Sequence, residues 1–257
     1  MSGSLEDYAL VLRRVDYGES DVIVDLLTPT RGRVSVFARG ARKSSRRFVG
    51  GLGVFTLLRV MVKPPRAEGL GTLTQSEALT FLEGIVDDPA RLAAGAHLLA
   101  LVRELVPEGS EQSALFEWLW GVLRWLHEAR PEGALLAFGM LRADLVLLQD
   151  SGLMGALDSC ARSEAPIEEL PSAVFLPTEG VVDARFAEEW AGVPLDSGGL
   201  RLLHGVLTRR RPSEVSAEAY SSLRRAFYNA WMHTLSHELK TWSVWDSAIE
   251  GALREER

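Results

Sequence analysis

The sequence predicts an α+β protein, with an N-terminal five-stranded OB-fold barrel followed by a mainly α-helical domain. Over the first 80 residues apolar side chains alternate with polar ones, which is typical of half-buried strands. From about residue 79 the apolar period changes to that of a helix, and all seven tryptophans follow residue 117. We therefore predict an OB-fold domain at 1–80 and a helical domain at 81–257.

Two tight turns are expected to join the first three strands. Alternation around 10–12 and 22–26 predicts the first two strands, with a turn at 17–19 between them. Gly32, in the second turn, can adopt a positive φ without steric cost. The third strand, at 33–39, directs alternate side chains to opposite faces. The set expected on the exposed face is Arg33, Ser35, Phe37 and Arg39.

A loop rich in glycine, serine and arginine is expected at 40–53. It leads to a fourth strand at 55–62 and a fifth at 70–78, joined by a proline-containing connection at 63–69. Five short strands with a long basic connection after the third are typical of an OB barrel.

The rest of the chain predicts helices separated by proline and glycine. Breaks are expected near Pro107 and Pro131, and the longest late helix is expected at 217–245. The segment at about 152–197 has no regular period and carries a hairpin signal around Gly180.

The charges of the chain are distributed unevenly. Residues 1–66 contain 12 Lys and Arg against 6 Asp and Glu, a net charge of +6, whereas the whole chain has a net charge of −7. Seven cations and no acidic residue lie between residues 31 and 47. They are Arg31, Arg33, Arg39, Arg42, Lys43, Arg46 and Arg47. A basic region confined to one part of an acidic protein is typical of a nucleic-acid site, so we predict that these seven residues bind nucleic acid.

Two interpretations of this basic block remain open at the level of sequence. It could be a solvated face neutralised by carboxylates of the acidic helical domain, or a groove that follows a nucleic-acid backbone. OB folds combine such charges with aromatic rings on which bases stack. Phe37 and Phe48 are the candidates for base stacking, with Tyr17 further away, and each could equally belong to the core. No base-reading pattern is present, so we expect binding that is independent of sequence and sensitive to salt.

The sequence carries no pattern typical of catalysis or of metal binding. Cys160 is the single cysteine, which excludes an internal disulfide and a cysteine-rich metal site. His233 and His237 are four residues apart on the expected late helix but lack the glutamate of the zincin motif. No Lys-Ser/Thr follows the glycines at 50–53, so a Walker loop is absent, and no nucleophile elbow is present. We predict a protein that is not an enzyme and that needs no cofactor.

We expect neither a secretory signal nor a membrane span. Glu6 and Asp7 stand where a secretory signal needs positive charge, and no segment is apolar enough to span a bilayer. We expect a cytoplasmic, nucleoid-associated protein without a membrane partner.

The N-terminal region resembles a known family, the bacterial recombination mediator RecO. The resemblance is dense over residues 8–80 and diffuse over the helical remainder. The segments that carry it are Ala9–Leu12, Tyr17–Asp21, Leu27-Thr28, Arg31–Val34, Ala38–Lys43 with Ser45-Arg46, then Leu52, Phe55, Thr56 and Gln75–Ala78.

The resemblance implies a DNA-repair mediator of the RecF-pathway type. Such a protein binds single- and double-stranded DNA, anneals complementary strands and, with RecR, helps RecA replace single-strand-binding protein. By the same resemblance, the basic segment that contacts DNA is Arg39, Arg42, Lys43, Arg46 and Arg47. The helical domain is expected to receive the acidic, Phe-ended tail of single-strand-binding protein in an apolar pocket flanked by cations. The alternatives are another OB-fold nucleic-acid binder, such as an RNA chaperone, and an enzyme that uses the barrel as a scaffold.

One departure from the family concerns zinc. Many members carry a four-cysteine zinc site in the helical domain, and here the stretch Gly152–Cys160 keeps its frame and its first cysteine. Ser163 stands where the second cysteine would be, and the later hairpin at 175–183 has none. Because tetrahedral zinc needs three or four ligands, we predict a zinc-less insertion at about 152–197 that depends on its own apolar contacts.

Overall fold

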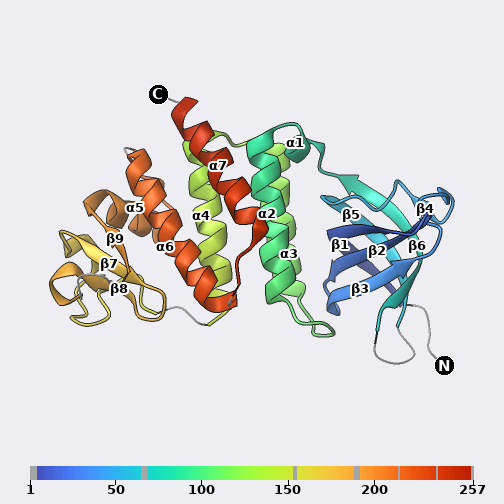
Figure 1. Ribbon diagram of the computed structural model, residues 1–257, viewed down its shortest axis with the longest axis horizontal. Coiled ribbons are helices and arrows are strands. Elements are labelled where there is room, and N and C mark those ends of the chain that lie inside the picture. Colours follow the sequence, from blue (N-terminus) through green and yellow to red (C-terminus); the bar gives the residue numbers. More distant parts are fainter. Residues whose placement is uncertain are drawn as a thin grey trace. The chain divides into compact units, whose positions relative to one another are not determined.

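The computed structural model describes residues 5–64, 69–152, 155–187, 192–213, 215–235 and 237–255 (Figure 1). The chain forms two compact units, one up to Pro131 and the other from Glu132. The first contains a closed five-stranded barrel followed by helices, so the predicted α+β class with an OB-type barrel is confirmed. The division predicted between residues 80 and 81 falls at the end of the last barrel strand and stays a prediction. Within the described residues, no helix has the length and apolarity needed to cross a bilayer.

The barrel closes on itself and contains a crossover, because β5 pairs with β1 and not with β3. Its strands follow the order β3-β2-β1-β5-β6, and parallel pairing of Val36 with Gly71 in β6 closes the ring. The strands are β1 (Leu5–Tyr17), β2 (Asp21–Thr28), β3 (Gly32–Ala38), β5 (Thr56–Lys63) and β6 (Gly71–Phe81). Alternation decides what lies inside, since Val22, Val24 and Leu26 of β2 are fully buried in the core.

The turn between β2 and β3 requires glycine for two reasons. Gly32 has a φ of +59°, and a Cβ at this position would lie 2.5 Å from the carbonyl oxygen of Ser110. The close approach lets the segment before the third helix bond to the turn. The N–H of Gly109 donates to the carbonyl of Arg31 (3.1 Å), and that of Gln112 donates to the carbonyl of Pro29 (2.8 Å).

The long loop predicted at 40–53 is mostly irregular and contributes side chains to the barrel core. It contains the two-residue strand β4 (Phe48–Val49), which pairs parallel to β6 through Phe48 and Ser76. Phe48 and Leu52 belong to the core cluster, and Ala41 packs against it. The loop is therefore an ordered part of the barrel.

Three helices complete the first unit. They are α1 (Glu83–Val86), α2 (Pro89–Leu105) and α3 (Ser113–Glu128). Asp88 caps α2 by accepting from the N–H of Arg91 (2.8 Å). Gly95 lets α2 approach the buried ring of Phe55, because a Cβ here would lie 2.7 Å from that ring.

The second unit combines helices with a small sheet. The helices are α4 (Gly133–Asp150), α5 (Ser197–Thr208), α6 (Ala217–Leu235) and α7 (Lys240–Glu255), with short 3-10 turns η1 (Ile167–Glu169) and η2 (Ala184–Phe186). The sheet has the order β8-β7-β9, from β7 (Ala173–Leu176), β8 (Gly180–Asp183) and β9 (Val193–Leu195). The predicted hairpin is confirmed as the β7–β8 pair, and Phe175 packs edge-on against Phe227 of α6 (6.3 Å between ring centroids).

The single late helix predicted at 217–245 is wrong, because α6 ends at Leu235 and α7 begins at Lys240. The two helices fold back on each other. The rings of Tyr228 and Trp242 lie 4.8 Å apart, and Arg224 pairs with Asp246. A continuous helix would keep these residues far apart, whereas the helical hairpin buries both apolar faces.

Candidate nucleic-acid interface

The outer face of β1, β2 and β3 carries an apolar row. Antiparallel pairing places Val15 opposite Ile23 and Ile23 opposite Phe37, so these three side chains share one face. Their inward neighbours Val22, Val36 and Ala38 are buried. The barrel core leaves this row on the outside, where Val15 is exposed and the other two are half-buried.

Tyr17 and Phe37 form an aromatic pair at the end of this row. Their ring centroids are 5.6 Å apart at 79°, and Tyr17 is 57% exposed. The guanidinium carbon of Arg39 lies 5.9 Å from the centroid of Phe37. Sequence spacing suggested that Tyr17 was remote from Phe37, but the register of the three strands brings the two rings together. An exposed ring that contacts a half-buried one beside a guanidinium is suited to stacking bases.

Phe48, the other predicted stacking residue, is a core residue. It is 3% exposed and packs inside the barrel, so its ring is not accessible to a base. The guanidinium of Arg47 covers it at 5.1 Å. The prediction fails for this residue because the loop folds back into the end of the barrel.

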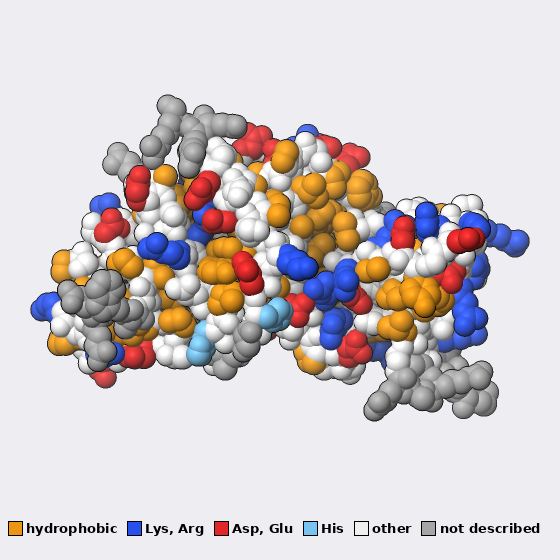
Figure 2. All heavy atoms as spheres, viewed as in Figure 1, with side chains coloured by type: hydrophobic (Ala, Val, Ile, Leu, Met, Phe, Trp, Pro, Cys, Tyr) orange, Lys and Arg blue, Asp and Glu red, His pale blue; other side chains and the backbone are white. Residues whose placement is uncertain are grey.

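The seven predicted cations form two groups. Six are exposed and Arg33 is half-buried. Arg31 and Arg33 lie at the start of β3, whereas the other five follow its end, and the six residues of strand from Arg33 to Arg39 span about 20 Å. We call the second group the loop cluster: Arg39, Arg42, Lys43, Arg46 and Arg47. Figure 2 shows Lys and Arg side chains gathered along the right-hand edge of the barrel.

Hydrogen bonds hold the backbone of the loop cluster in place. The N–H of Gly40 donates to Asp21 (2.7 Å), and the N–H of Arg42 donates to the carbonyl of Ser20 (3.0 Å). On the other side, the N–H of Ser76 donates to the carbonyl of Arg47 (2.8 Å). The bond from Gly40 is the main cause that lowers the pKa of Asp21. The loop cluster therefore presents its charges from a defined backbone.

Most charges of the loop cluster have no carboxylate partner. Asp16 lies 3.6 Å from Arg42 and also 2.9 Å from Arg14. Arg47 donates to the carbonyl of Arg39 (2.6 Å) and to the hydroxyl of Ser44 (3.3 Å). Among the described residues, no carboxylate lies within 4.0 Å of the charged groups of Arg39, Lys43, Arg46 and Arg47. Among the described residues, the carboxylates that pair with any of the seven cations at 31–47 are Asp16 and Glu108. Both belong to the first unit and not to the acidic second unit.

Two cations of β1 were missed by the sequence analysis. Arg13 and Arg14 are exposed, and Arg13 lies opposite Asp25 on the face that carries the apolar row. The signal for Arg13 in the sequence was the alternation that continues from Arg13 through Val15 to Tyr17 on the same strand.

The residues considered for metal binding do not come together. Over the described part of the chain, no group of three or more His, Cys, Asp or Glu side chains could hold a metal ion. His233 and His237 do not lie on one helix as the predicted late helix required, because α6 ends at Leu235. Cys160 is buried, and its sulfur accepts from the N–H of Asp183 (3.2 Å).

Comparisons with known proteins agree with this architecture. Residues 1–81 match the family model for the N-terminal domain of recombination protein O, and residues 86–238 match the model for its C-terminal domain. A protein of Anaeromyxobacter dehalogenans named DNA repair protein RecO is 43% identical, with 90% of this chain and 91% of the relative covered. A protein of the same name from Myxococcus xanthus is 35% identical, with 92% and 94% covered. The chain therefore belongs to the RecO family, which acts in DNA repair and recombination.

Proposed function

We propose that this protein is a non-enzymatic recombination mediator that binds and anneals single- and double-stranded DNA. The observation that carries the proposal is the loop cluster, in which four cations have no carboxylate partner among the described residues and one of them, Arg39, lies beside the aromatic pair of Tyr17 and Phe37. With RecR, the protein helps RecA to load on strands covered by single-strand-binding protein. This activity places it at the nucleoid.

The proposed mechanism is electrostatic. The loop cluster holds one strand by its phosphates, and the aromatic pair supports one or two bases by stacking. The remaining bases stay free to pair with an incoming strand. Annealing requires that the mutual repulsion of two phosphate backbones be reduced, and cations on an ordered loop reduce it without covalent chemistry.

The tail of single-strand-binding protein is proposed to bind in the second unit. A cavity of about 410 Å³ lies between η1 and α5, with Ile167, Leu170 and Leu200 in its wall. Arg201 and Arg210 also line it, and neither forms an ion pair with a described residue. The carboxylate of Glu168 also lines the cavity and lies 2.9 Å from His204, so the two arginines are the cations left for a tail that is acidic and ends in phenylalanine.

Two assays test the proposed function. The protein should accelerate annealing of complementary oligonucleotides, followed by fluorescence quenching, and should be retained by an immobilised C-terminal peptide of single-strand-binding protein. A peptide without its last phenylalanine is the control for retention, and Arg201→Ala should weaken it. A protein that prefers structured RNA and shows neither property would be an RNA chaperone, and the proposal would be wrong.

A further inference from the structure

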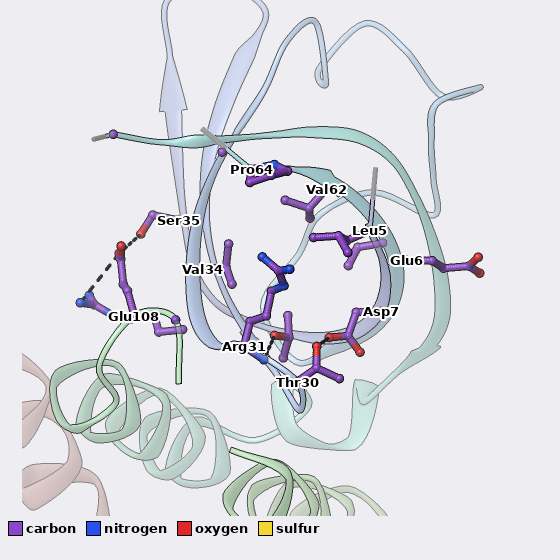
Figure 3. Close-up of a pocket in the computed structure, with 16 residues that line it drawn as sticks. Leu5, Glu6, Asp7, Thr30, Arg31, Val34, Ser35, Val62, Pro64 and Glu108 are labelled. Atoms are coloured by element: carbon purple, nitrogen blue, oxygen red, sulfur yellow. Dashed lines mark hydrogen bonds and ion pairs between the residues drawn. The ribbon is translucent and has the colours of Figure 1, made fainter. Parts of the chain in front are cut away.

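A second site lies at the end of the barrel that is remote from the loop cluster. It is a cavity of about 250 Å³ between the start of β1, the β2–β3 turn, the end of β5 and the segment at Glu108 (Figure 3). Its walls include Leu5, Val34, Val62 and Pro64, all of them partly exposed, and none of the described residues that line it is aromatic. The cavity therefore offers aliphatic surface to a ligand.

The charged residues around this cavity differ in whether their side chains have a bonding partner. Asp7 accepts from the hydroxyl of Thr30 (2.5 Å), and Glu6 lies 3.9 Å from Arg59. Glu108 accepts from the hydroxyl of Ser35 (3.0 Å) and lies 3.9 Å from Arg33. Each carboxylate in the lining thus has a partner.

Arg31 differs from these groups. Its guanidinium points into the cavity toward Leu5 and Val62 (Figure 3), and among the described residues it forms no hydrogen bond or ion pair. Among the described residues Arg31 thus has no anionic partner and lies next to aliphatic walls, while Asp7 is bonded to the uncharged hydroxyl of Thr30 and to the N–H of Tyr8. An apolar group attached to a carboxylate matches this combination, because a guanidinium binds a carboxylate with two parallel hydrogen bonds.

Within the described strands, the backbone of β1 beside the cavity is paired on one edge. Residues 5–9 of β1 pair with β5 on one edge, whereas the ladder to β2 begins only at Leu10. On that second edge the N–H of Tyr8 bonds to the Asp7 side chain (2.8 Å) and not to a described strand. Open strand edges bind extended peptides through main-chain hydrogen bonds.

We propose that this end of the barrel binds the C-terminal residue of an extended partner polypeptide. Its aliphatic side chain packs on Val34 and Val62, and its terminal carboxylate pairs with Arg31. The volume is below the range of about 300–1,000 Å³ that is usual for drug-sized ligands, so one residue enters. Asp7 and Glu108 line the cavity together with Glu6, whose side chain points away from it in Figure 3, and these carboxylates favour a segment with neutral or basic residues before its terminus.

The same features argue against DNA as the occupant. Among the described residues the lining has no ring for base stacking, and a cavity of about 250 Å³ is too small for a nucleotide to enter whole. About 13 Å of strand separates Ser35, the residue of β3 in the lining that is nearest the loop cluster, from Arg39, so the proposal does not depend on the proposed DNA binding.

Fluorescence anisotropy with the full chain tests the proposal. The probe is a labelled peptide Gly-Lys-Thr-Lys-Leu with a free C-terminus, compared with its C-terminal amide and with the acidic peptide Gly-Asp-Thr-Asp-Leu. Loss of a charge-assisted contact should weaken binding of the amide by about 10- to 100-fold, and Arg31→Ala should reduce affinity for the free acid to that of the amide. The matched control, Arg39→Ala with Lys43→Ala, should bind the peptide as the unchanged protein does.

Three outcomes would overturn the proposal. The first is no binding of the basic peptide at millimolar concentration, or equal binding of acid and amide. The second is tighter binding of the acidic peptide with the same dependence on Arg31. The third is displacement of the peptide by a short single strand in the variant with Arg39 and Lys43 removed, which would make the cavity a nucleotide subsite.

Discussion

The charges of the loop cluster predict a specific change in the salt dependence of DNA binding. The test variant replaces Arg39, Lys43 and Arg46 by alanine, because these exposed cations have no carboxylate partner and no hydrogen bond to the loop among the described residues. Arg47 is kept, since its guanidinium bonds to the carbonyl of Arg39 and to Ser44. The variant therefore removes charge and leaves the loop's own contacts.

The expected magnitude follows from counterion release. Each phosphate contact on a single strand contributes about −0.7 to the slope of log K against log salt concentration, so the slope should flatten by about 2. At about 50 mM salt, loss of these three contacts should lower the affinity of the variant for a single strand by about two to three orders of magnitude. Anisotropy of a labelled oligothymidine, titrated at several salt concentrations, measures both quantities.

The matched control removes the same number of charges elsewhere in the first unit. Arg103, Arg124 and Arg130 each pair with a carboxylate of the helices or their connections, and their replacement by alanine should leave the slope unchanged. If both variants flatten the slope equally, net charge and not the loop cluster determines binding. If neither does, and circular dichroism shows both folded, the DNA site lies elsewhere.

Three further predictions concern stacking, the β2–β3 turn and the buried thiol. Replacing Tyr17 and Phe37 by alanine should weaken single-strand binding by about 1–3 kcal/mol per stacked base with an unchanged salt slope, and a changed slope would contradict stacking. Gly32→Ala should destabilise the protein by at least about 2 kcal/mol in denaturant unfolding, because φ is +59° and the added Cβ meets the carbonyl oxygen of Ser110. The control Gly18→Ala, at φ +58° in open space, should cost only about 1 kcal/mol. Equal losses of stability in the two variants would refute the role of the contact with Ser110. Burial raises the pKa of the Cys160 thiol, but the hydrogen bonds to its sulfur, of which that from the N–H of Asp183 is the strongest, lower it by more. The pKa therefore falls from 9.0 to about 7. Between these two values the unfolded chain holds a proton that the folded protein has released, so stability should rise with pH across this window and should not do so in Cys160→Ser.

Local sequence patterns were sufficient to predict the fold class and the basic part of the candidate site. Alternation with period two identified the barrel strands, and Gly32 was placed in the correct turn, because both depend on neighbours within a few residues. The basic block was identified by counting charges. Its exposure agrees with that count, since a run of cations without acidic neighbours cannot be neutralised locally.

Other features depended on contacts between distant segments. The sequence was equally consistent with an exposed and a buried Phe48. In the structure its loop folds over the end of the barrel, and Phe48 is therefore part of the core. The late helix was predicted as continuous because its apolar period continues across the break, and only the pairing of Tyr228 with Trp242 shows where the chain reverses.

The sequence by itself determined that this protein has an OB-type barrel, a helical remainder and a basic segment in an acidic chain. These properties follow from residue type and from periodicity, which act over a few residues. The tertiary structure decided that Tyr17 meets Phe37, that Arg31 is separated from the loop cluster, and that Arg31 points into an aliphatic cavity. The physical reason is that strand register and barrel closure bring together residues far apart in the chain, and neither is encoded in local composition.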